Sequence, residues 1–560
     1  MDTLAKKTRL LSLPHIGDKE VKLLFTALVS LPIVTFVVYP LWAILKTSFI
    51  TADGSWGMDN YILYFTDPKF LVIVNNSFVV STATTVVTLV LAYAFAYGLS
   101  RTCIPFKAVW QTIAMLPLFA PSLVQALGFI FLLGRNGLVS RMLGIEIDIY
   151  GFCGILLSNV LYSLPHALMI LLTSLEYADS RHYESARMLG AKGWRIFFTI
   201  TLPSTRYGVM SAAFVVFTIT ITDFGNPMVI GGDYNVLATE IYNQVSGQAN
   251  FSMGAVIGMV LLAPAALAMA VERWVAKRQA ALITSHSVQL KPAPSKTLDT
   301  MMLVFVAVVS VAVLAIIGII IFASFVKLWP YNMTMTLKNY QFDVQNGLDP
   351  IWTSIWMSLL AALIGMIMVA SGAFIVQKLK HPFARVLYFL SILPASVPGM
   401  VLGLGYIFAF NDPANPVYLI YGTVIMLSIN SVYHYHAQAF LTATTSLKQV
   451  SDTFDEASTM LGGGFLRSMR RITLPIIWPS LVRLAVFFFM RAMVTLSAVI
   501  FLVSPSTNLA AVSVLLLDDA GNTTQAAAFS TLIIGVVVLV LLVFQLILRL
   551  FGVENINLIQ

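Results

Sequence analysis

Long apolar stretches alternate with short polar ones from residue 22 almost to the end of the chain. A membrane-spanning helix needs about 20 mostly apolar residues, and twelve stretches satisfy that requirement. The first six lie near residues 22–48, 70–99, 108–134, 152–176, 205–230 and 252–273, and the second six near 300–325, 351–378, 384–410, 416–442, 477–504 and 525–551. Only helices and closed barrels can satisfy every backbone group inside a bilayer, and stretches this long are typical of helices. The pattern therefore predicts an all-α polytopic membrane protein.

Composition agrees with this prediction. Of the 560 residues, 58% are hydrophobic and only 10% are charged, whereas soluble domains carry roughly 25% charged residues. The two cysteines, Cys103 and Cys153, cannot form a disulfide framework and have no metal-ligand spacing. The first apolar run, residues 23–45, is too long for the core of a signal peptide, so we expect a retained membrane helix.

The basic residues predict the orientation of the helices. With the N-terminus inside, only six of the 33 lysines and arginines lie on the outer side, and one, Arg491, lies within a span. Such a bias fits the positive-inside rule, and it explains the net charge of +8 without nucleic acid. We therefore expect cytoplasmic N- and C-termini.

The chain also repeats itself. Leu116-Pro117, Pro121 and Gly128 recur 277 residues later as Leu393-Pro394, Pro398 and Gly405, and "DNYILYF" at 59–65 has a counterpart in "KNYQF" at 338–342. An even number of predicted helices separates the copies, so the halves run in the same direction, as parallel repeats do. The expected organisation is a cytoplasmic tail (1–21), a first permease-like domain (22–273), a polar cytoplasmic linker (274–299) and a second domain (300–560).

A polar, punctuated segment occurs once in each half. Residues 184–203 read "ESARMLGAKGWRIFFTITLP", and residues 456–475 read "EASTMLGGGFLRSMRRITLP". A central glycine suits a turn between two short helices, because glycine tolerates a left-handed backbone, and a proline is tolerated in the first turn of the next helix. One such segment could be an interfacial helix without a partner, but two copies at the same spacing favour a function.

Both segments follow one pattern: E-A-A, three residues, G, nine residues and I-x-L-P. This pattern resembles the signature of inner-membrane permeases of bacterial binding-protein-dependent ABC importers. Each copy replaces one alanine by serine, at Ser185 and Ser458. The resemblance covers nearly the whole chain and implies the type I ABC importer permease fold, as two fused domains. It also implies that the two segments, the coupling loops 178–203 and 450–475, dock on a cytoplasmic ATPase. The positions that would carry this coupling are Glu184, Ala186, Gly190, Leu202 and Pro203 in the first loop, and Glu456, Ala457, Gly462, Leu474 and Pro475 in the second.

The resemblance further implies the partners and the substrate class. The partners would be an ABC ATPase, expected as a homodimer with one subunit at each loop, and a periplasmic substrate-binding protein. The fused form is similar to permeases for ferric iron and for 2-aminoethylphosphonate, with "TDFGNPMVIGGDYNVLATEIYNQV" and "VPGMVLGLGYIFAFN" similar to the latter branch. The expected location is the bacterial inner membrane.

Enzymatic motifs are missing from the sequence. It contains no G-x-x-x-x-G-K-[ST] phosphate loop, so we expect ATP and Mg²⁺ to be used by the partner and no cofactor to be bound by this chain. Neither HExxH, paired-cysteine nor nucleophile-elbow patterns occur. The isolated histidines His166, His434 and His436 are more typical of interhelical hydrogen bonding than of metal ligands.

Two charges fall inside predicted spans, Asp223 in the fifth and Arg491 in the eleventh. Ionisable residues in a membrane usually serve a function, so both are candidates for the substrate pathway. They could instead form a structural ion pair, or lie separately near helix ends. The donor fork of an arginine suits a phosphonate or phosphate group.

Two classes of function remain open at this point. The first is the membrane subunit of an ATP-driven importer. The second is an ion-coupled secondary transporter, because twelve helices in two parallel halves also describe that class. The duplicated loop favours the importer, since a secondary transporter has no ATPase on which to dock.

Overall fold

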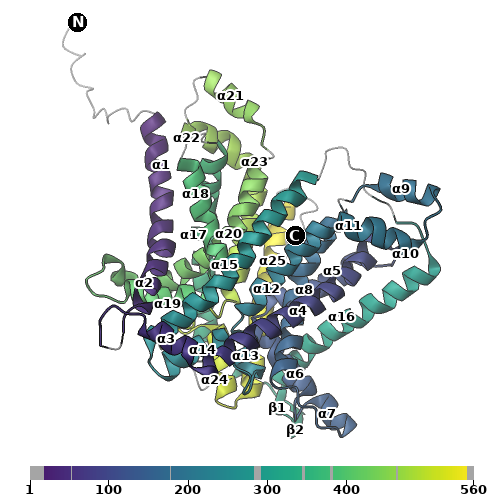
Figure 1. The fold of residues 1–560 in the computed structure, drawn as a ribbon, viewed down its shortest axis with the longest axis horizontal. Coiled ribbons are helices and arrows are strands. Elements are labelled where there is room, and N and C mark those ends of the chain that lie inside the picture. The colour runs from purple at the N-terminus through teal and green to yellow at the C-terminus, as the bar shows by residue number, and fades with distance from the viewer. Residues whose placement is uncertain are drawn as a thin grey trace.

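The computed structural model is helical apart from one short hairpin (Figure 1). It describes residues 18–51, 53–176, 178–282, 290, 292–342, 347–378, 383–448, 450–461 and 465–550. We call residues 18–282 the N-terminal half and residues 292–550 the C-terminal half.

In the described residues of the N-terminal half, the named elements are all helical, and one isolated β-bridge joins Ile50 and Trp56. Its α-helices are α1 (Asp18–Ile33), α2 (Tyr39–Ser48), α3 (Asp59–Thr66), α4 (Pro68–Arg101), α5 (Lys107–Met115), α6 (Ser122–Leu133), α7 (Leu138–Leu143), α8 (Phe152–Glu176), α9 (Ser180–Met188), α10 (Gly193–Ile196), α11 (Leu202–Ser204), α12 (Arg206–Ile221), α13 (Gly225–Ile230), α14 (Leu237–Tyr242) and α15 (Phe251–Leu282). Short π- or 3₁₀-helical turns join some of them: η1 (Val34–Val38), η2 (Leu116–Phe119), η3 (Phe197–Thr201) and η4 (Asn243–Gly247).

The C-terminal half follows a similar order. Its elements are α16 (Lys296–Ser324), β1 (Val326–Leu328), β2 (Asn332–Met335), η5 (Lys338–Tyr340), α17 (Asp349–Lys378), α18 (Phe383–Ile392), η6 (Leu393–Ser396), α19 (Gly399–Phe410), η7 (Pro416–Ile420), α20 (Val424–Lys448), α21 (Asp452–Met460), α22 (Phe465–Ser468), η8 (Met469–Thr473), α23 (Leu474–Met493), α24 (Ala510–Asp519) and α25 (Thr523–Leu550). Strands β1 and β2 pair antiparallel.

The number of spans differs from the twelve expected. Within the described ranges, nine helices are long and apolar enough to cross a membrane, and the number rises to eleven if each of two bent pairs counts as one span. The tenth predicted stretch, 416–442, contains η7 and most of α20. Helix α20 is not among the nine, because serine, asparagine, histidine and threonine residues interrupt its apolar sequence. The chain is thus an all-α polytopic membrane protein, with spans less regular than hydropathy indicates.

Proline explains two of the irregularities. The predicted continuous spans 108–134 and 384–410 are both broken, and the second bends by 111° between η6 and α19. A residue that precedes proline is pushed out of the helical region. Accordingly, Ala120 before Pro121 has φ −124° and ψ 148°, and Val397 before Pro398 has φ −96° and ψ 115°.

Two other predicted spans are wrong at their ends. The stretch 205–230 is a helix pair, 193–204 and 206–221, bent by 64°, and α13 is a separate short helix. The stretch 477–504 stops being helical at Met493, and its span begins earlier, at Met469.

The repeat extends to individual hydrogen bonds. Asn60 of α3 donates its side-chain amide to the carbonyl oxygens of Ser48 and Ile50, and Asn339 of η5 does the same to Ser324 and Val326. The adjacent tyrosine hydroxyls, of Tyr61 and Tyr340, then lie 2.8 Å from the Oγ atoms of Ser48 and Ser324. The similar sequences "DNY" and "KNY" therefore form the same set of hydrogen bonds at the end of the first membrane-spanning helix of each half.

The first membrane-spanning helix of each half, 23–48 and α16, packs against the other half. α2 contacts α19, and α16 contacts α6. Glycines permit these crossings: a Cβ atom at Gly128 of α6 would lie 2.6 Å from Cγ2 of Ile316, and one at Gly405 of α19 would lie 3.0 Å from the carbonyl oxygen of Pro40. The two glycines are the pair found 277 residues apart in the sequence, so the repeat includes this reciprocal contact.

Both coupling loops lie at the same end of the bundle. Figure 1 shows α9, α10, α21 and α22 at this end, which we call the loop end, and α7 with the β1–β2 hairpin at the opposite, hairpin end.

Candidate functional sites

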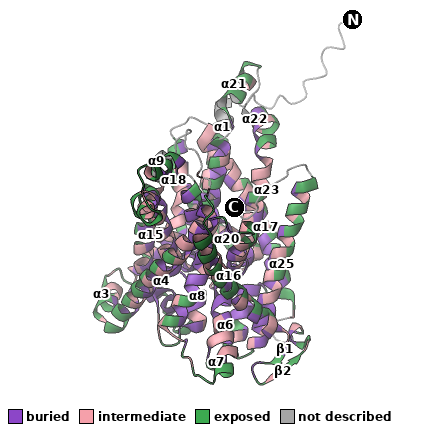
Figure 2. Ribbon diagram, turned by 90° about the vertical axis from the view of Figure 1, so that its right-hand side faces the viewer, coloured by how far each residue is buried: buried purple, intermediate pink, exposed green. Residues whose placement is uncertain are grey.

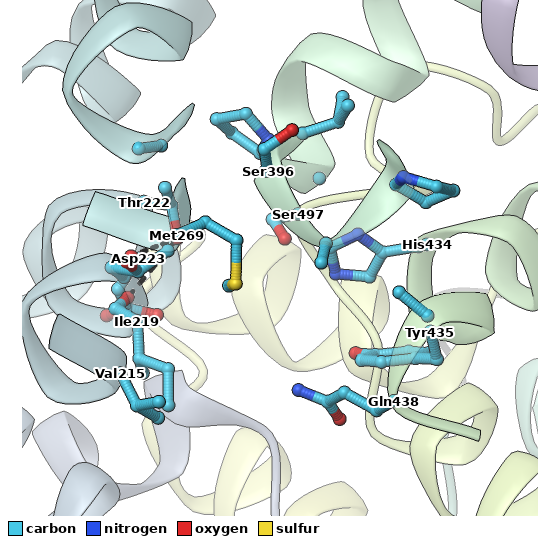
Figure 3. A pocket seen from close by; sticks show the side chains of 18 of the residues that line it. Val215, Ile219, Thr222, Asp223, Met269, Ser396, His434, Tyr435, Gln438 and Ser497 are labelled. Carbon is cyan, nitrogen blue, oxygen red and sulfur yellow. Dashed lines mark hydrogen bonds between the residues drawn. The ribbon is translucent and has the colours of Figure 1, made fainter. Parts of the chain in front are cut away.

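A cavity of about 280 Å³ lies between the two halves (Figure 3). Helices α8, α12 and α15 line it from the N-terminal half, and η6, α20 and α23 from the C-terminal half. Both in-membrane charges found in the sequence, Asp223 and Arg491, belong to its lining.

Arg491 connects the halves across this cavity. Its Nη2 atom lies 2.8 Å from Nε2 of His166 on α8. An arginine can only donate, so His166 accepts through Nε2 and carries its proton on Nδ1. The guanidinium carbon also lies 5.6 Å from the ring centroid of Tyr435 and 5.9 Å from that of Phe487, distances that suit cation–π attraction. His166 is thus an interhelical hydrogen-bonding group, as the sequence predicts.

Asp223 lies just beyond the end of α12 and is 8% exposed. Its Oδ2 atom accepts a 3.1 Å hydrogen bond from the backbone N–H of Asn226, in the first turn of α13. The side chain of Asn226 in turn donates to Oδ1 of Asn159 at 2.8 Å. A carboxylate at a helix N-terminus is favoured by the free N–H groups there, so local contacts hold Asp223 in place.

Asp223 and Arg491 do not pair with each other. Both are described, and no ion pair within 4.0 Å joins them. In Figure 3, Asp223 lies on one wall of the cavity, while His434 and Tyr435 lie on the opposite wall. The ion-pair interpretation is therefore wrong, and each charge has its own local partners while lining the shared cavity.

Further polar groups line the cavity that the sequence did not single out. They include Tyr162, Glu272, Arg273, Gln438 and Ser497. Glu272 accepts from Ser211 Oγ at 2.9 Å, and its Oε2 atom lies 3.8 Å from Nε of Arg273. Glu272 and Arg273 lie at the end of an expected span, 252–273, where charged residues are ordinary, so no sequence signal set them apart.

The cavity contains no evident metal centre. No group of three or more histidine, cysteine, aspartate or glutamate residues that could hold a metal ion occurs in the described ranges. The other two histidines do not follow the prediction of interhelical hydrogen bonding. His434 lines the cavity, and its buried Nδ1 atom has no hydrogen-bond partner within the described structure, nor does either ring nitrogen of His436.

The first coupling loop has the predicted helix–turn–helix form. Helix α9 carries Glu184, which is exposed, and Ala186, whose carbonyl oxygen accepts from the N–H of Ala191 at 2.9 Å. Gly190 forms the turn with φ +73°, in the left-handed region that favours glycine. Leu202 and Pro203 form the first turn of α11.

The second coupling loop repeats this order. Glu456 and Ala457 lie in α21, and Leu474 and Pro475 begin α23. A π-helical turn precedes the Leu-Pro pair in both copies, Phe197–Thr201 and Met469–Thr473. Gly462 lies outside the described residues.

The first loop is fixed to the bundle through Arg101, the last residue of α4. Its Nη2 atom donates to the carbonyl oxygen of Leu175 at 2.6 Å and to the hydroxyl of Tyr183 at 3.4 Å. Tyr183, on α9, is 4% exposed. At the equivalent end of α17, Lys378 donates to the carbonyl oxygen of Val450 at 3.1 Å. In each half, a cation at the end of the second long helix therefore holds the start of the coupling loop.

Similarity to known proteins decides the family. Residues 104–281 match the family described as binding-protein-dependent transport system inner membrane component. The chain is 31% identical over 551 residues to the ferric transport system permease protein FbpB of Actinobacillus pleuropneumoniae, covering 94% of this chain and 78% of the relative. An FbpB relative of Haemophilus influenzae is also 31% identical, covering 88% and 79%.

The chain belongs to the binding-protein-dependent ABC importer permeases. This membership confirms the resemblance read from the coupling loops and rejects the secondary-transporter alternative. Within the family the chain is a multi-pass membrane subunit of the inner membrane. A solved bacterial ABC transporter that imports the polysaccharide alginate has a chain 17% identical to this one, with a TM-score of 0.40, covering 48% of this chain and 98% of that one.

Proposed function

We propose that this permease forms the pathway of an ATP-driven importer for ferric iron. The observation that carries the proposal is the 31% identity to FbpB over 94% of the chain. A periplasmic binding protein delivers the substrate at the hairpin end. A separate ABC ATPase, as a homodimer, binds one coupling loop with each subunit at the loop end and uses ATP and Mg²⁺, while the permease itself binds no cofactor.

The proposal fixes the orientation of the bundle. The loop end, both termini and the linker 274–299 face the cytoplasm, which places most lysines and arginines inside. The two domains, 22–273 and 300–560, rock against each other when ATP closes the ATPase dimer. The cavity lies between them, so this motion changes which side of the membrane the cavity faces.

The lining of the cavity limits the form in which iron passes. The two arginines of the lining, Arg273 and Arg491, offset the charges of Asp223 and Glu272, so the cavity offers no net negative charge to a bare trivalent cation. No preformed cluster of three acidic, histidine or cysteine ligands exists in the described residues. The cavity therefore suits iron that carries oxygen-bearing anions, whose oxygen atoms can accept hydrogen bonds from the guanidinium.

The charged residues that line the cavity also support a second substrate class. Asp223 and Arg491 place opposite charges around one cavity without neutralising each other. A small zwitterion such as 2-aminoethylphosphonate would match this arrangement, with its ammonium group toward Asp223 and its phosphonate toward Arg491.

One reconstitution tests both substrates. The purified permease, its ATPase and its binding protein are placed in proteoliposomes, and uptake of radiolabelled ferric iron and of 2-aminoethylphosphonate is measured with and without ATP. The proposal expects ATP-dependent iron uptake and no ATP hydrolysis by the permease alone. Uptake of the phosphonate instead of iron would favour the second substrate class. ATP hydrolysis by the isolated permease would contradict the proposal that a separate ATPase hydrolyses the ATP.

A further inference from the structure

Each coupling loop ends its first helix in an exposed methionine–leucine pair. Met188 and Leu189 are 89% and 87% exposed, and Met460 and Leu461 are 90% and 87% exposed. In both copies the leucine N–H donates a 3.1 Å hydrogen bond to the carbonyl oxygen four residues earlier. Figure 2 shows α9 and α21 as exposed elements at the same end of the molecule. Large apolar side chains left this open at equivalent places indicate a surface that a partner covers.

The charges around the two pairs differ in sign. Helix α9, "SRHYESARM", has two arginines against one glutamate, whereas α21, "DTFDEASTM", has three acidic residues and no lysine or arginine. A partner that recognised one loop by charge would be repelled by the other, because like charges across an interface are unfavourable. The apolar pair is what the two helices share.

We propose that Met188–Leu189 and Met460–Leu461 are the anchors of the ATPase interface. The occupant is a two-fold symmetric ATPase dimer that presents the same apolar pocket twice. The parallel repeats place the two pairs equivalently about an axis along the membrane normal, and an apolar anchor within a polar rim is the usual anatomy of an interface hot spot. This inference rests on the proposed function and adds to it the side chains that hold the partner.

A membrane surface is a poorer occupant of these pairs. Helices that lie on a bilayer combine a broad apolar face with a basic polar face. Helix α21 has three acidic residues instead, and anionic lipid headgroups would repel it.

The chain supplies a matched control for the anchors. Residues 141–144 read Arg-Met-Leu-Gly, the same four residues as 187–190. Met142 and Leu143 are 77% and 62% exposed, and Gly144 ends its helix with φ +66°. This copy lies in and after α7 at the hairpin end, away from the coupling loops (Figure 1). Replacing this pair by serine changes the same side chains in the same local structure without touching the proposed interface.

The first test measures retention of the ATPase by purified permease variants. Met188→Ser with Leu189→Ser, or Met460→Ser with Leu461→Ser, should weaken retention by about tenfold or more, because a buried leucine or methionine contributes that much to binding. Both pairs together should abolish it, and Met142→Ser with Leu143→Ser should leave it unchanged. If both coupling-loop pairs can be replaced while ATPase retention and transport stay normal, the anchors are assigned wrongly. If the unaltered permease retains no ATPase, the proposed function itself fails.

The second test asks whether the two anchors meet the same pocket. A photoreactive benzoylphenylalanine replaces Leu189 in one variant and Leu461 in another, and crosslinked peptides of the purified complex are identified by mass spectrometry. The expected result is the same ATPase peptide from both positions. Different peptides from the two positions, or adducts with lipid alone, would contradict the proposal that a two-fold symmetric ATPase dimer binds both pairs.

Discussion

Nη2 of Arg491 lies 2.8 Å from Nε2 of His166, and the two residues belong to opposite halves of the chain. The contact crosses the cavity that the halves share, so any rocking of one half against the other must lengthen or re-form it. A hydrogen bond with a charged partner contributes roughly 1.5–3 kcal/mol, enough to influence which conformation is occupied.

The first prediction concerns this contact. Arg491→Ala should lower transport by about tenfold or more, since both a cation of the cavity lining and the link to His166 are lost. Arg491→Lys keeps the charge but loses the planar donor fork, so it should recover transport only in part. Transport in vesicles is compared with the amount of permease in the membrane. An equal loss of both in Arg491→Ala would favour a purely structural role.

The second prediction separates the charge of Asp223 from its shape. Asp223→Asn keeps an oxygen that can accept from the N–H of Asn226, so the start of α13 should remain ordered and the permease should reach the membrane in normal amounts. Transport should still fall, because the cavity loses its negative charge on that wall. Asp223→Ala should lower both. Normal transport by Asp223→Asn would show that the carboxylate charge is not used.

The third prediction concerns the turn of the first coupling loop. Gly190→Val places a β-branched side chain at φ +73°, which costs roughly 1 kcal/mol or more. No atom lies within 4 Å of an added Cβ, so the backbone conformation rather than a clash carries the effect. The variant should insert into the membrane, hold the ATPase weakly and transport poorly.

A graded series completes this test. Gly190→Asn should be milder, because asparagine tolerates the left-handed region, and Glu184→Ala should have a smaller effect of the same kind. Copurification of the ATPase and transport are measured for each. The equivalent prediction for Gly462→Val and Glu456→Ala rests on the sequence repeat alone. Normal coupling in Gly190→Val would mean that the turn is not needed.

Arg101 carries the fourth prediction, because it joins the coupling loop to the transmembrane bundle. It contacts both Leu175 and Tyr183, and its guanidinium carbon lies 5.0 Å from the tyrosine ring centroid. Arg101→Gln should leave ATPase binding largely intact, since the exposed face of α9 is unchanged. The motion of the ATPase would then reach α4 and α8 less effectively, so more ATP should be hydrolysed for each substrate molecule transported. An unchanged ratio of hydrolysis to transport would contradict this role.

Much of this architecture could be predicted from short sequence motifs that occur once in each half. The Leu-Pro pairs, Gly128 with Gly405, and Asn60 with Asn339 occupy matching places because each meets a backbone requirement that the residue type itself reveals. The breaks at Pro121 and Pro398 were missed, because a hydropathy average passes over one proline in an apolar run. Of the residues that line the cavity, the sequence marked Asp223 and Arg491 as candidates for a substrate pathway. Tyr162 and Gln438 face it as well, but the sequence of a membrane helix does not show which side faces lipid.

The fifth prediction tests the reciprocal packing of the halves. In Gly128→Ala the new Cβ would lie 2.6 Å from Cγ2 and 2.8 Å from the carbonyl oxygen of Ile316. The backbone contact cannot be relieved by a rotamer change, so α6 and α16 must separate, and overpacking of this kind costs about 1–3 kcal/mol. The permease should unfold at a lower temperature in detergent. Gly405→Ala should act in the same direction but less strongly, because its nearest contacts, to Ile44 and Pro40, lie at 3.0 Å.

Gly318→Ala is the matched control for this measurement. Gly318 lies on α16, close in sequence to Ile316, but no atom lies within 4 Å of its added Cβ. Alanine is favoured over glycine in a helix by about 1 kcal/mol, so this variant should unfold at the same temperature as the unaltered chain or slightly higher. If Gly128→Ala behaved like Gly318→Ala, α6 and α16 would not approach as closely as the glycine requires. A drop confined to Gly128→Ala and Gly405→Ala would instead show that the two halves are held together by the reciprocal crossing of their first membrane-spanning helices.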